Sequence, residues 1–305
     1  MKKLLDLQPA TNQINELLYP VSLSPVFAVT DEGRCKKFSE ETNRFKAIVN
    51  ENTNEIVSVV SSNYKLLSNE EAVLRGKQVF KELFPGVKPD DLIPFKVISP
   101  KSLASCHIDF IHRDVKLSHD DWVQDIWFPF IRVSNSYNRS VAFKLEIGFV
   151  RELCSNGVIF RKDTLELKSY HDRDLRFTFD EKLEKLKQHE NAFVQHLNRL
   201  KAIETDSKLV FDVVCNALNL SFDVVNKNSL IREKEIERQL KTKKIIEELV
   251  KGYFLEMDNT AYAVLNVLSD FVSHQSEYKC IPGFSINPDI YYKKVSDWMI
   301  DKSNG

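Results

Sequence analysis

The sequence predicts an α+β protein: an N-terminal mixed or antiparallel sheet domain followed by a helical region with long charged helices. Before about residue 178, short runs of β-branched and aromatic residues alternate with breaks rich in Asn, Ser and Gly, as in strands joined by turns. After that point, apolar residues recur three and four apart, the helical spacing. The length of 305 residues suits two domains, or one domain with a helical appendage. We expect a sheet-rich domain at 1–178, helices at 179–276, and a tail at 277–305 with a short helix.

The first clear elements are a hairpin and a capped helix. Two β-branched runs, Phe45–Val49 and Ile56–Val60, flank an Asn-rich turn and predict a β-hairpin. Ser68 followed three residues later by Glu71 predicts a helix that begins with a reciprocal cap and ends before Pro85. Further strands are expected at Phe95–Ile98 and within Leu103–Leu117.

Residues 128–160 are the most informative part of the chain. Two strand-like runs, Phe128–Val133 and Val141–Val150, flank a polar turn predicted at 135–140. A second break is expected at 154–157, where Gly157 is free to take positive φ. This layout holds polar side chains at the edge of a sheet, where a ligand could meet them.

The region 180–275 is predicted to be helical almost throughout. Alternating spacings of three and four residues predict the seam of a coiled coil or helical hairpin. The residues of this seam are Leu183, Leu186, Glu190, Phe193, Leu197 and Leu200. A short apolar helix is expected at Lys208–Leu218, and a charged helix at Ser229–Tyr253 with a thin apolar stripe. That stripe comprises Ile231, Ile236, Leu240, Ile246 and Leu249. A last helix is expected at Ala261–His274. The segment Ser229–Tyr253 carries charges of both signs. This pattern favours an exposed, solvated helix that contacts another subunit, and it disfavours a basic stripe that binds nucleic acid.

Composition limits the classes of function. The 43 basic and 44 acidic residues give almost no net charge, which disfavours duplex DNA binding by the whole surface. Only eight Gly are present, so glycine-rich phosphate loops are not expected. The five Cys are scattered without the spacing of a zinc knuckle or redox dithiol. With no signal peptide and no run of about 20 apolar residues, we expect a cytoplasmic protein with reduced thiols and no membrane partner.

Neither a metal centre nor an enzyme active site is predicted. The densest group of possible ligands is Cys106, His107, Asp109, His112, Asp114, His119, Asp120 and Asp121. Alternation along a strand would scatter these groups to opposite faces, whereas zinc needs three or four converging ligands. Cys154 has apolar neighbours and no adjacent His, so a structural thiol is favoured over a nucleophile. We expect no catalytic residue, no metal and no cofactor.

Polar residues in and around the turns are the candidate binding residues. Arg offers a planar fork for carboxylate or phosphate, and Tyr can stack on a base or anchor a protein contact. The alternative is that these groups only make turns and caps, which use the same residue types. The candidates are Tyr64, Lys65, Arg132, Asn135, Tyr137, Asn138, Arg139, Arg151 and Asn156.

Four motifs carry a family resemblance. They are VVSSNYKLLSNEEAV, VSNSYNRSVAF, VRELCSNGVIF and MDNTAYAVLNVLSDFVSH, in that order. Together they resemble an uncharacterised family of phage- and plasmid-encoded proteins known by a domain-of-unknown-function label, over roughly residues 44–275. The resemblance implies a mobile-element origin and a mixed core of sheet and helices, and it brings no established active site.

Two functions follow as hypotheses. The first is a non-catalytic phage or plasmid accessory protein that oligomerises and binds a host complex, such as a defence nuclease that it inhibits. The second is single-stranded nucleic-acid binding or strand annealing by a sheet face bearing Arg132, Tyr137, Arg139 and Arg151. A metal-dependent nuclease is a third and poorly supported reading.

Overall fold

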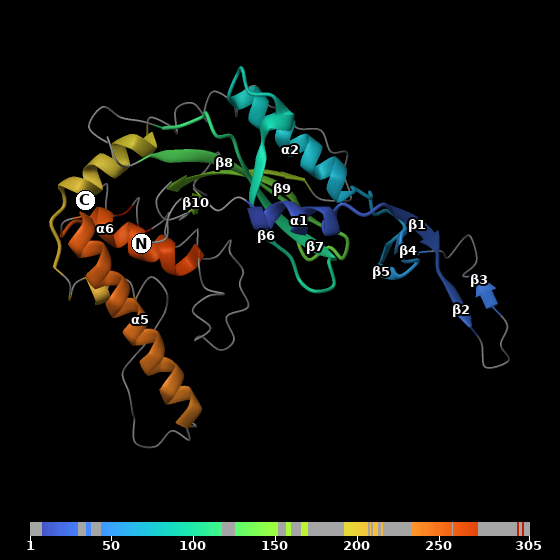
Figure 1. The fold of residues 1–305 in the computed structure, drawn as a ribbon. Helices are drawn as coiled ribbons and strands as arrows, with labels where there is room; N and C mark the ends of the chain where they lie inside the picture. Colours follow the sequence, from blue (N-terminus) through green and yellow to red (C-terminus); the bar gives the residue numbers. More distant parts are fainter. Residues whose placement is uncertain are drawn as a thin grey trace.

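The computed structural model confirms the α+β class and describes most of the chain (Figure 1). It describes residues 8–29, 35–37, 44–117, 126–151, 157–159, 166–169, 192–206, 208, 210–212, 215, 233–257, 259–273, 298 and 301. The sheet-rich part contains α1 (Gln8–Leu17), β1 (Val21–Pro25), β2 (Phe27–Val29), β3 (Cys35–Lys37), β4 (Phe45–Asn50), β5 (Ile56–Ser61), α2 (Asn69–Leu83), a 3-10 turn η2 (Pro89–Asp91), β6 (Ile93–Ile98), β7 (Ser105–Ile111), β8 (Trp127–Ser136), β9 (Phe143–Arg151), β10 (Gly157–Ile159) and β11 (Glu166–Ser169). Two named helices follow, α5 (Glu233–Met257) and α6 (Ala261–Ser273).

The largest sheet is antiparallel and has the strand order β10-β9-β8-β7-β6, with β11 paired to β9 as well. Its central strand β8 continues to Ser136, so the predicted turn at 135–140 begins two residues too early. Asn135 and Ser136 stay in the strand because both are buried and find hydrogen-bond partners there. The reversal itself occupies residues 137–142, before β9.

One face of this sheet carries the main core. Near one end, α2 packs on β8, and its Gly76 lies against Val133 and Leu145. Near the other end, the helix at residues 192–202 places Phe193 flat against Phe149, with ring centroids 4.2 Å apart. Trp127 donates from Nε1 to the Tyr262 hydroxyl of α6 at 3.3 Å. Residues on both sides of the predicted boundary at 178 therefore share one core, while residue 178 itself lies outside the described residues.

Of the two hydrogen bonds predicted for the reciprocal cap of α2, the one accepted by the Ser68 side chain is confirmed. The Ser68 side chain accepts from the Glu71 N–H at 3.1 Å, and the helix ends at Leu83. The Glu71 carboxylate forms an ion pair with Arg75, one turn later. The buried face of α2 is apolar and rests on the sheet, as its spacing predicts.

A smaller unit, the arm, extends away from the main sheet in Figure 1. We define the arm as β1 to β5, which form a three-stranded sheet of order β1-β4-β5 and a two-stranded ribbon of β2 and β3. The predicted hairpin at 45–60 is confirmed as β4 and β5. A bulge between Ile48 and Val49 shifts the pairing, so that Val49 meets Ile56.

Two predicted helices of the C-terminal part can be compared with the described residues. Helix α6 begins at Ala261 as expected, and α5 continues to Met257, four residues beyond its predicted end. Ile246 and the partly buried Leu249 belong to the core, but Leu240 is exposed, which corrects the predicted apolar stripe. Of the predicted seam, Phe193, Leu197 and Leu200 are buried, and its earlier members lie outside the described residues. Within the described part of the chain, no helix is long and apolar enough to cross a membrane.

Candidate interaction surface

A buried polar cluster joins the arm, the two N-terminal helices and the main sheet. We define this junction cluster as Tyr19, Tyr64, Asn69, Asn135 and Tyr137, all of which are buried. It contains three of the candidate binding residues. Its members come from three stretches of the chain, which follow α1, join β5 to α2 and end β8, and they meet where β8 ends and the arm begins.

Asn69 and Asn135 link the N-terminal helices to β8. Asn69 donates from Nδ2 to the Leu17 carbonyl at the end of α1, at 2.9 Å. Asn135 donates from Nδ2 to the Leu67 carbonyl at 3.0 Å and to the Asn69 Oδ1 at 2.9 Å. These bonds satisfy backbone carbonyls that would otherwise be buried without partners. The amide of Asn135 therefore holds the segment before α2 onto the sheet.

The two tyrosines among the candidates also bond inside the fold. The Tyr137 hydroxyl accepts from the Asn69 N–H at 2.9 Å and so satisfies one free donor at the start of α2. The Tyr64 hydroxyl donates to the Ser136 carbonyl at 2.8 Å. Burial raises the pKa of the Tyr64 phenol, and the positive charge of Arg139 offsets part of that rise.

The arm is attached through this same cluster. Ser58 of β5 donates from Oγ to the Tyr137 carbonyl at 2.6 Å. Ile48 and Val60 are buried against Tyr19, Tyr64 and Tyr137. The inner face of the arm sheet is therefore occupied by contacts within the chain.

The face of the main sheet opposite α2 carries a buried row of charges. Arg132 donates to both carboxylate oxygens of Asp109 on the neighbouring strand, at 2.6 and 2.7 Å. On β9, Lys144 and Glu146 form an ion pair at 3.0 Å. All four side chains are buried, as is Arg151, whose guanidinium lies 6.0 Å from the ring centroid of Tyr262. Bidentate pairing of this kind is what allows a guanidinium to be buried.

The remaining described candidates are exposed, unlike those above. Lys65, Asn138 and Arg139 are exposed; Asn138 accepts from the Ser140 N–H at 3.0 Å, and Arg139 has a φ of 63°. This is the tight turn that the sequence predicts for these residue types, shifted to 137–142. Asn156 lies outside the described residues. The structure thus brings Tyr64, Asn135 and Tyr137 together inside the fold and separates them from Arg132 and Arg151.

The described residues of the ligand-rich segment do not converge either, and His119, Asp120 and Asp121 lie outside the described residues. The His107 Nδ1 lies 2.8 Å from the Ser134 Oγ, Asp109 pairs with Arg132, and His112 accepts from the Asp114 N–H. No group of three His, Cys, Asp or Glu within the described residues is placed to hold a metal ion. Burial raises the pKa of the Cys106 thiol to about 12, which keeps it protonated and unreactive at neutral pH.

Sequence reasoning missed the exposed apolar side chains of the arm. Phe45, Ile56 and Val59 are 53%, 65% and 53% exposed, although each is in a strand. Val59 pairs with Ala47, and Ile56 pairs with Val49 beyond the bulge, so strand alternation places both on the same face as Phe45. We call this the outer face of the arm. A signal was present in the sequence: β4 and β5 carry apolar residues at successive positions, which indicates two apolar faces.

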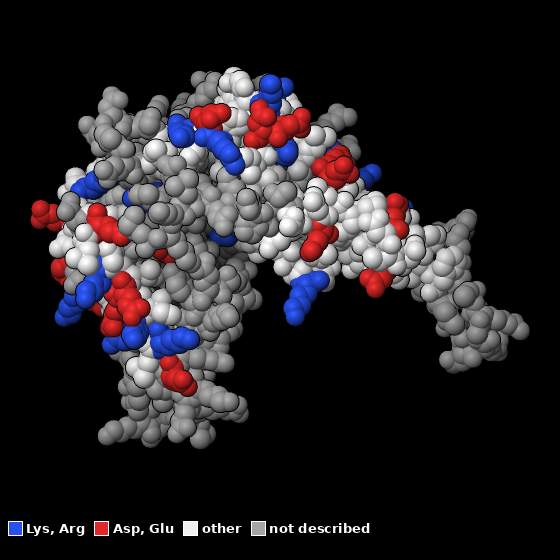
Figure 2. Space-filling model, viewed as in Figure 1, with Lys and Arg blue, Asp and Glu red and all other residues white. Residues whose placement is uncertain are grey.

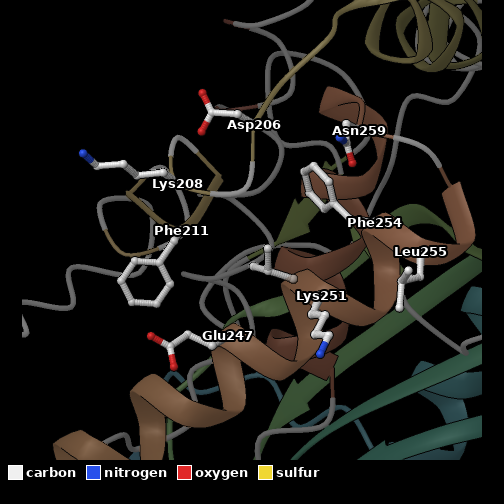
Figure 3. Close-up of a pocket in the computed structure, with 9 residues that line it drawn as sticks. Asp206, Lys208, Phe211, Glu247, Lys251, Phe254, Leu255 and Asn259 are labelled. Atoms are coloured by element: carbon white, nitrogen blue, oxygen red, sulfur yellow. The ribbon is translucent and has the colours of Figure 1, made fainter.

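Charge is mixed over the visible surface. Figure 2 shows Lys and Arg interspersed with Asp and Glu over α2 and α5, while the described part of the arm is mainly uncharged. A groove of about 700 Å³ lies between α5 and the residues Asp206, Lys208 and Phe211 (Figure 3). Its apolar part is formed by Phe211, Val250, Phe254 and Leu255.

Comparisons with known proteins give a family and no activity. The family model for a domain of unknown function, DUF932, matches residues 110–295, from the last two residues of β7 to beyond the end of α6. The arm precedes the matched segment. No curated protein and no solved structure matches the chain. Because the match covers more than half of the 305 residues, the chain belongs to the DUF932 family of domains of unknown function.

Proposed function

We propose that this protein is a non-catalytic accessory protein of a phage or plasmid that oligomerises and binds a host protein complex through the outer face of its arm. The most concrete version is inhibition of a host anti-phage defence complex, such as a defence nuclease, in the host cytoplasm. The observation that carries the proposal is the set of three exposed apolar side chains, Phe45, Ile56 and Val59, on one face of a sheet.

The composition of this face favours a protein partner over a nucleic acid. Beside the apolar residues, the register places Ser22, Ser24 and Ser61 on the same face. The turn that joins β4 to β5 carries Glu51 and Glu55, both exposed. Such a surface gains by burying apolar area, as clustered exposed apolar residues usually do at protein interfaces. Ile56 and Val59 are therefore the expected centre of the contact.

Capture from a host that expresses the protein would test the proposal. The tagged wild-type chain should co-purify with a defined protein complex, which is then purified and rebound to the pure chain. The double variant Ile56→Ser/Val59→Ser should lose this binding. The matched control is Leu74→Ser, because Leu74 is an exposed apolar residue on α2, away from the arm. Retained binding by the arm variant, or equal loss in the control, would contradict the proposal.

Single-stranded nucleic-acid binding is the second candidate, and one observation favours it. Lys65 and Arg139 are both exposed, and the charge of Arg139 offsets part of the rise that burial causes in the pKa of the Tyr64 phenol, so two cations flank the same buried tyrosine. Arg132 and Arg151, which the annealing hypothesis placed on the binding face, are buried in the described conformation. Binding of a labelled single strand that weakens with salt and is lost in Arg139→Ala would favour this candidate.

A further inference from the structure

Strand β5 lies at the open edge of the arm sheet. The strand order is β1-β4-β5, and within the described residues β5 pairs with no strand other than β4. An edge strand presents a row of backbone N–H and C=O groups to which a further strand can bond. The direction in which each residue of β5 points its backbone groups therefore decides what this edge can bind.

Two hydrogen bonds fix that direction. The Ser62 N–H donates to the Arg44 carbonyl at 2.8 Å, so Ser62 points its backbone groups toward the β4 side. Backbone groups alternate in direction along an antiparallel strand, which points those of Ser61 and Val59 toward the open edge. The Ser61 carbonyl agrees, because it accepts from the Tyr64 N–H at 2.9 Å, outside the sheet. An incoming strand can therefore bond to the N–H and carbonyl of Val59 and to the Ser61 N–H.

The other edge strands that the structure describes have features that discourage strand addition. β6 contains Pro94 and Lys96 and packs against α1. β2, β3, β10 and β11 have only three or four residues each, and β1 ends at Pro25. β5 has six residues, Ile-Val-Ser-Val-Val-Ser, without a charged residue or a proline. Its bulge interrupts the edge at Val57, so the stretch Ser58–Ser61 is regular.

We propose that β5 binds an extended segment of the host partner, which adds to the arm sheet as a fourth strand antiparallel to β5. This inference rests on the proposed function and specifies the form of the partner's contact. The residue opposite Val59 lies on the outer face of the arm, so we expect it to be apolar and β-branched. Glu51 and Glu55 are exposed at the start of β5 and favour Lys or Arg near the C-terminal end of the incoming segment.

A strand added at this edge would also cover part of the outer face. Alternate side chains of that strand lie on the same side as Ile56 and Val59, which are 65% and 53% exposed. In strand addition the main-chain bonds supply affinity, and the alternate side chains supply specificity. The occupant is therefore a polypeptide in extended form, because neither a helix nor a nucleic acid presents main-chain groups at this spacing.

Two substitutions at one position separate edge pairing from contact with the outer face alone. Val59→Pro keeps an apolar side chain of similar size and removes the N–H that points to the open edge. Val59→Ala keeps that N–H and removes apolar area. The probe is the host complex captured with the wild-type chain and then purified. We expect Val59→Pro to raise its dissociation constant roughly tenfold or more, and Val59→Ala to raise it less. An equal or larger effect in Val59→Ala would overturn the inference.

Hydrogen exchange in the wild-type chain gives a second readout that does not depend on a variant. The Val59 amide should exchange quickly in the free chain and roughly tenfold more slowly in the complex. The Val60 amide, which points toward β4, should be protected in both states. A Val59 amide that exchanges as quickly in the complex as in the free chain would overturn the inference. Val59→Pro should keep a urea midpoint close to that of wild type, because the lost N–H lies outside the ladder.

The remaining outcomes separate this inference from the proposed function. If Ile56→Ser/Val59→Ser loses the partner while Val59→Pro binds as wild type, the proposed function stands and this inference fails. If neither variant loses the partner, both fail. The pure Val59→Pro chain should have the same mass in solution as wild type. A lower mass would mean that the edge pairs with a second copy of the chain, which would overturn the inference.

Discussion

The main sheet and the arm sheet are both antiparallel, but the main sheet buries polar side chains whereas the arm sheet exposes apolar ones. In β8 all residues are buried, including Arg132, Ser134 and Asn135. In β5 the apolar residues Ile56 and Val59 are exposed. The polar groups of β8 therefore lie inside the fold, where they form hydrogen bonds with other groups of the chain. The outer face of the arm, which we propose as the binding surface, is apolar, so the two sheets predict opposite responses to mutation.

The largest effect should come from removing one partner of the buried pair between Asp109 and Arg132. The variant Asp109→Ala leaves a guanidinium buried without its carboxylate, and the free energy of unfolding should fall by about 3–5 kcal/mol. Urea unfolding would measure this loss. The matched control is Glu71→Ala, which removes half of the exposed pair with Arg75 and should cost less than about 1 kcal/mol. Equal losses from the two pairs would contradict the distinction drawn here.

Removal of a single hydroxyl oxygen from the junction cluster should lower the stability of the fold nearly as much. Tyr137→Phe keeps the ring but leaves the buried Asn69 N–H without its acceptor, so the free energy of unfolding should fall by about 1–3 kcal/mol. Protection of the Asn69 amide from hydrogen exchange should fall with it. If the variant matched wild type in both measurements, the cluster would not have the structural role assigned to it.

Two helical glycines should respond in opposite directions to the same substitution. A Cβ on Gly76 of α2 would clash with Val133, so Gly76→Ala should destabilise the fold by about 1–3 kcal/mol. A Cβ on Gly252 of α5 would meet nothing within 4 Å, and Gly252→Ala should stabilise by about 0.5–1 kcal/mol through helix propensity. Thermal unfolding of both variants tests this pair. A stabilised Gly76→Ala would show that α2 does not pack tightly on β8.

These expectations show how much the sequence could predict. Local signals were sufficient for the α+β class, the arm hairpin, the Ser68 cap and the start of α6, because each depends on neighbouring residues. The end of β8 was misplaced because Asn135 and Ser136 are turn residues by propensity but are held in a strand by distant partners. The same limit applies to the candidate site. Whether Arg132 or Tyr137 faces solvent depends on tertiary packing, which no local pattern encodes.

The smallest effect on stability, with the largest on function, is expected at the outer face of the arm. Ile56→Ser/Val59→Ser removes side chains that are already exposed, so unfolding should change by about 0.5 kcal/mol or less. Circular dichroism and urea unfolding would check that the fold is intact. A large loss of stability would mean that these residues support the fold and are not free to bind.

The most direct measurement is a binding isotherm between the pure chain and its captured host partner, for wild type, Ile56→Ser/Val59→Ser and Lys65→Ala/Arg139→Ala. We predict that the arm variant loses the partner, while the variant without the two exposed cations binds as wild type at low and high salt. Full binding by the arm variant, with a loss in the cation variant that is largest at low salt and shrinks as salt rises, would contradict the account.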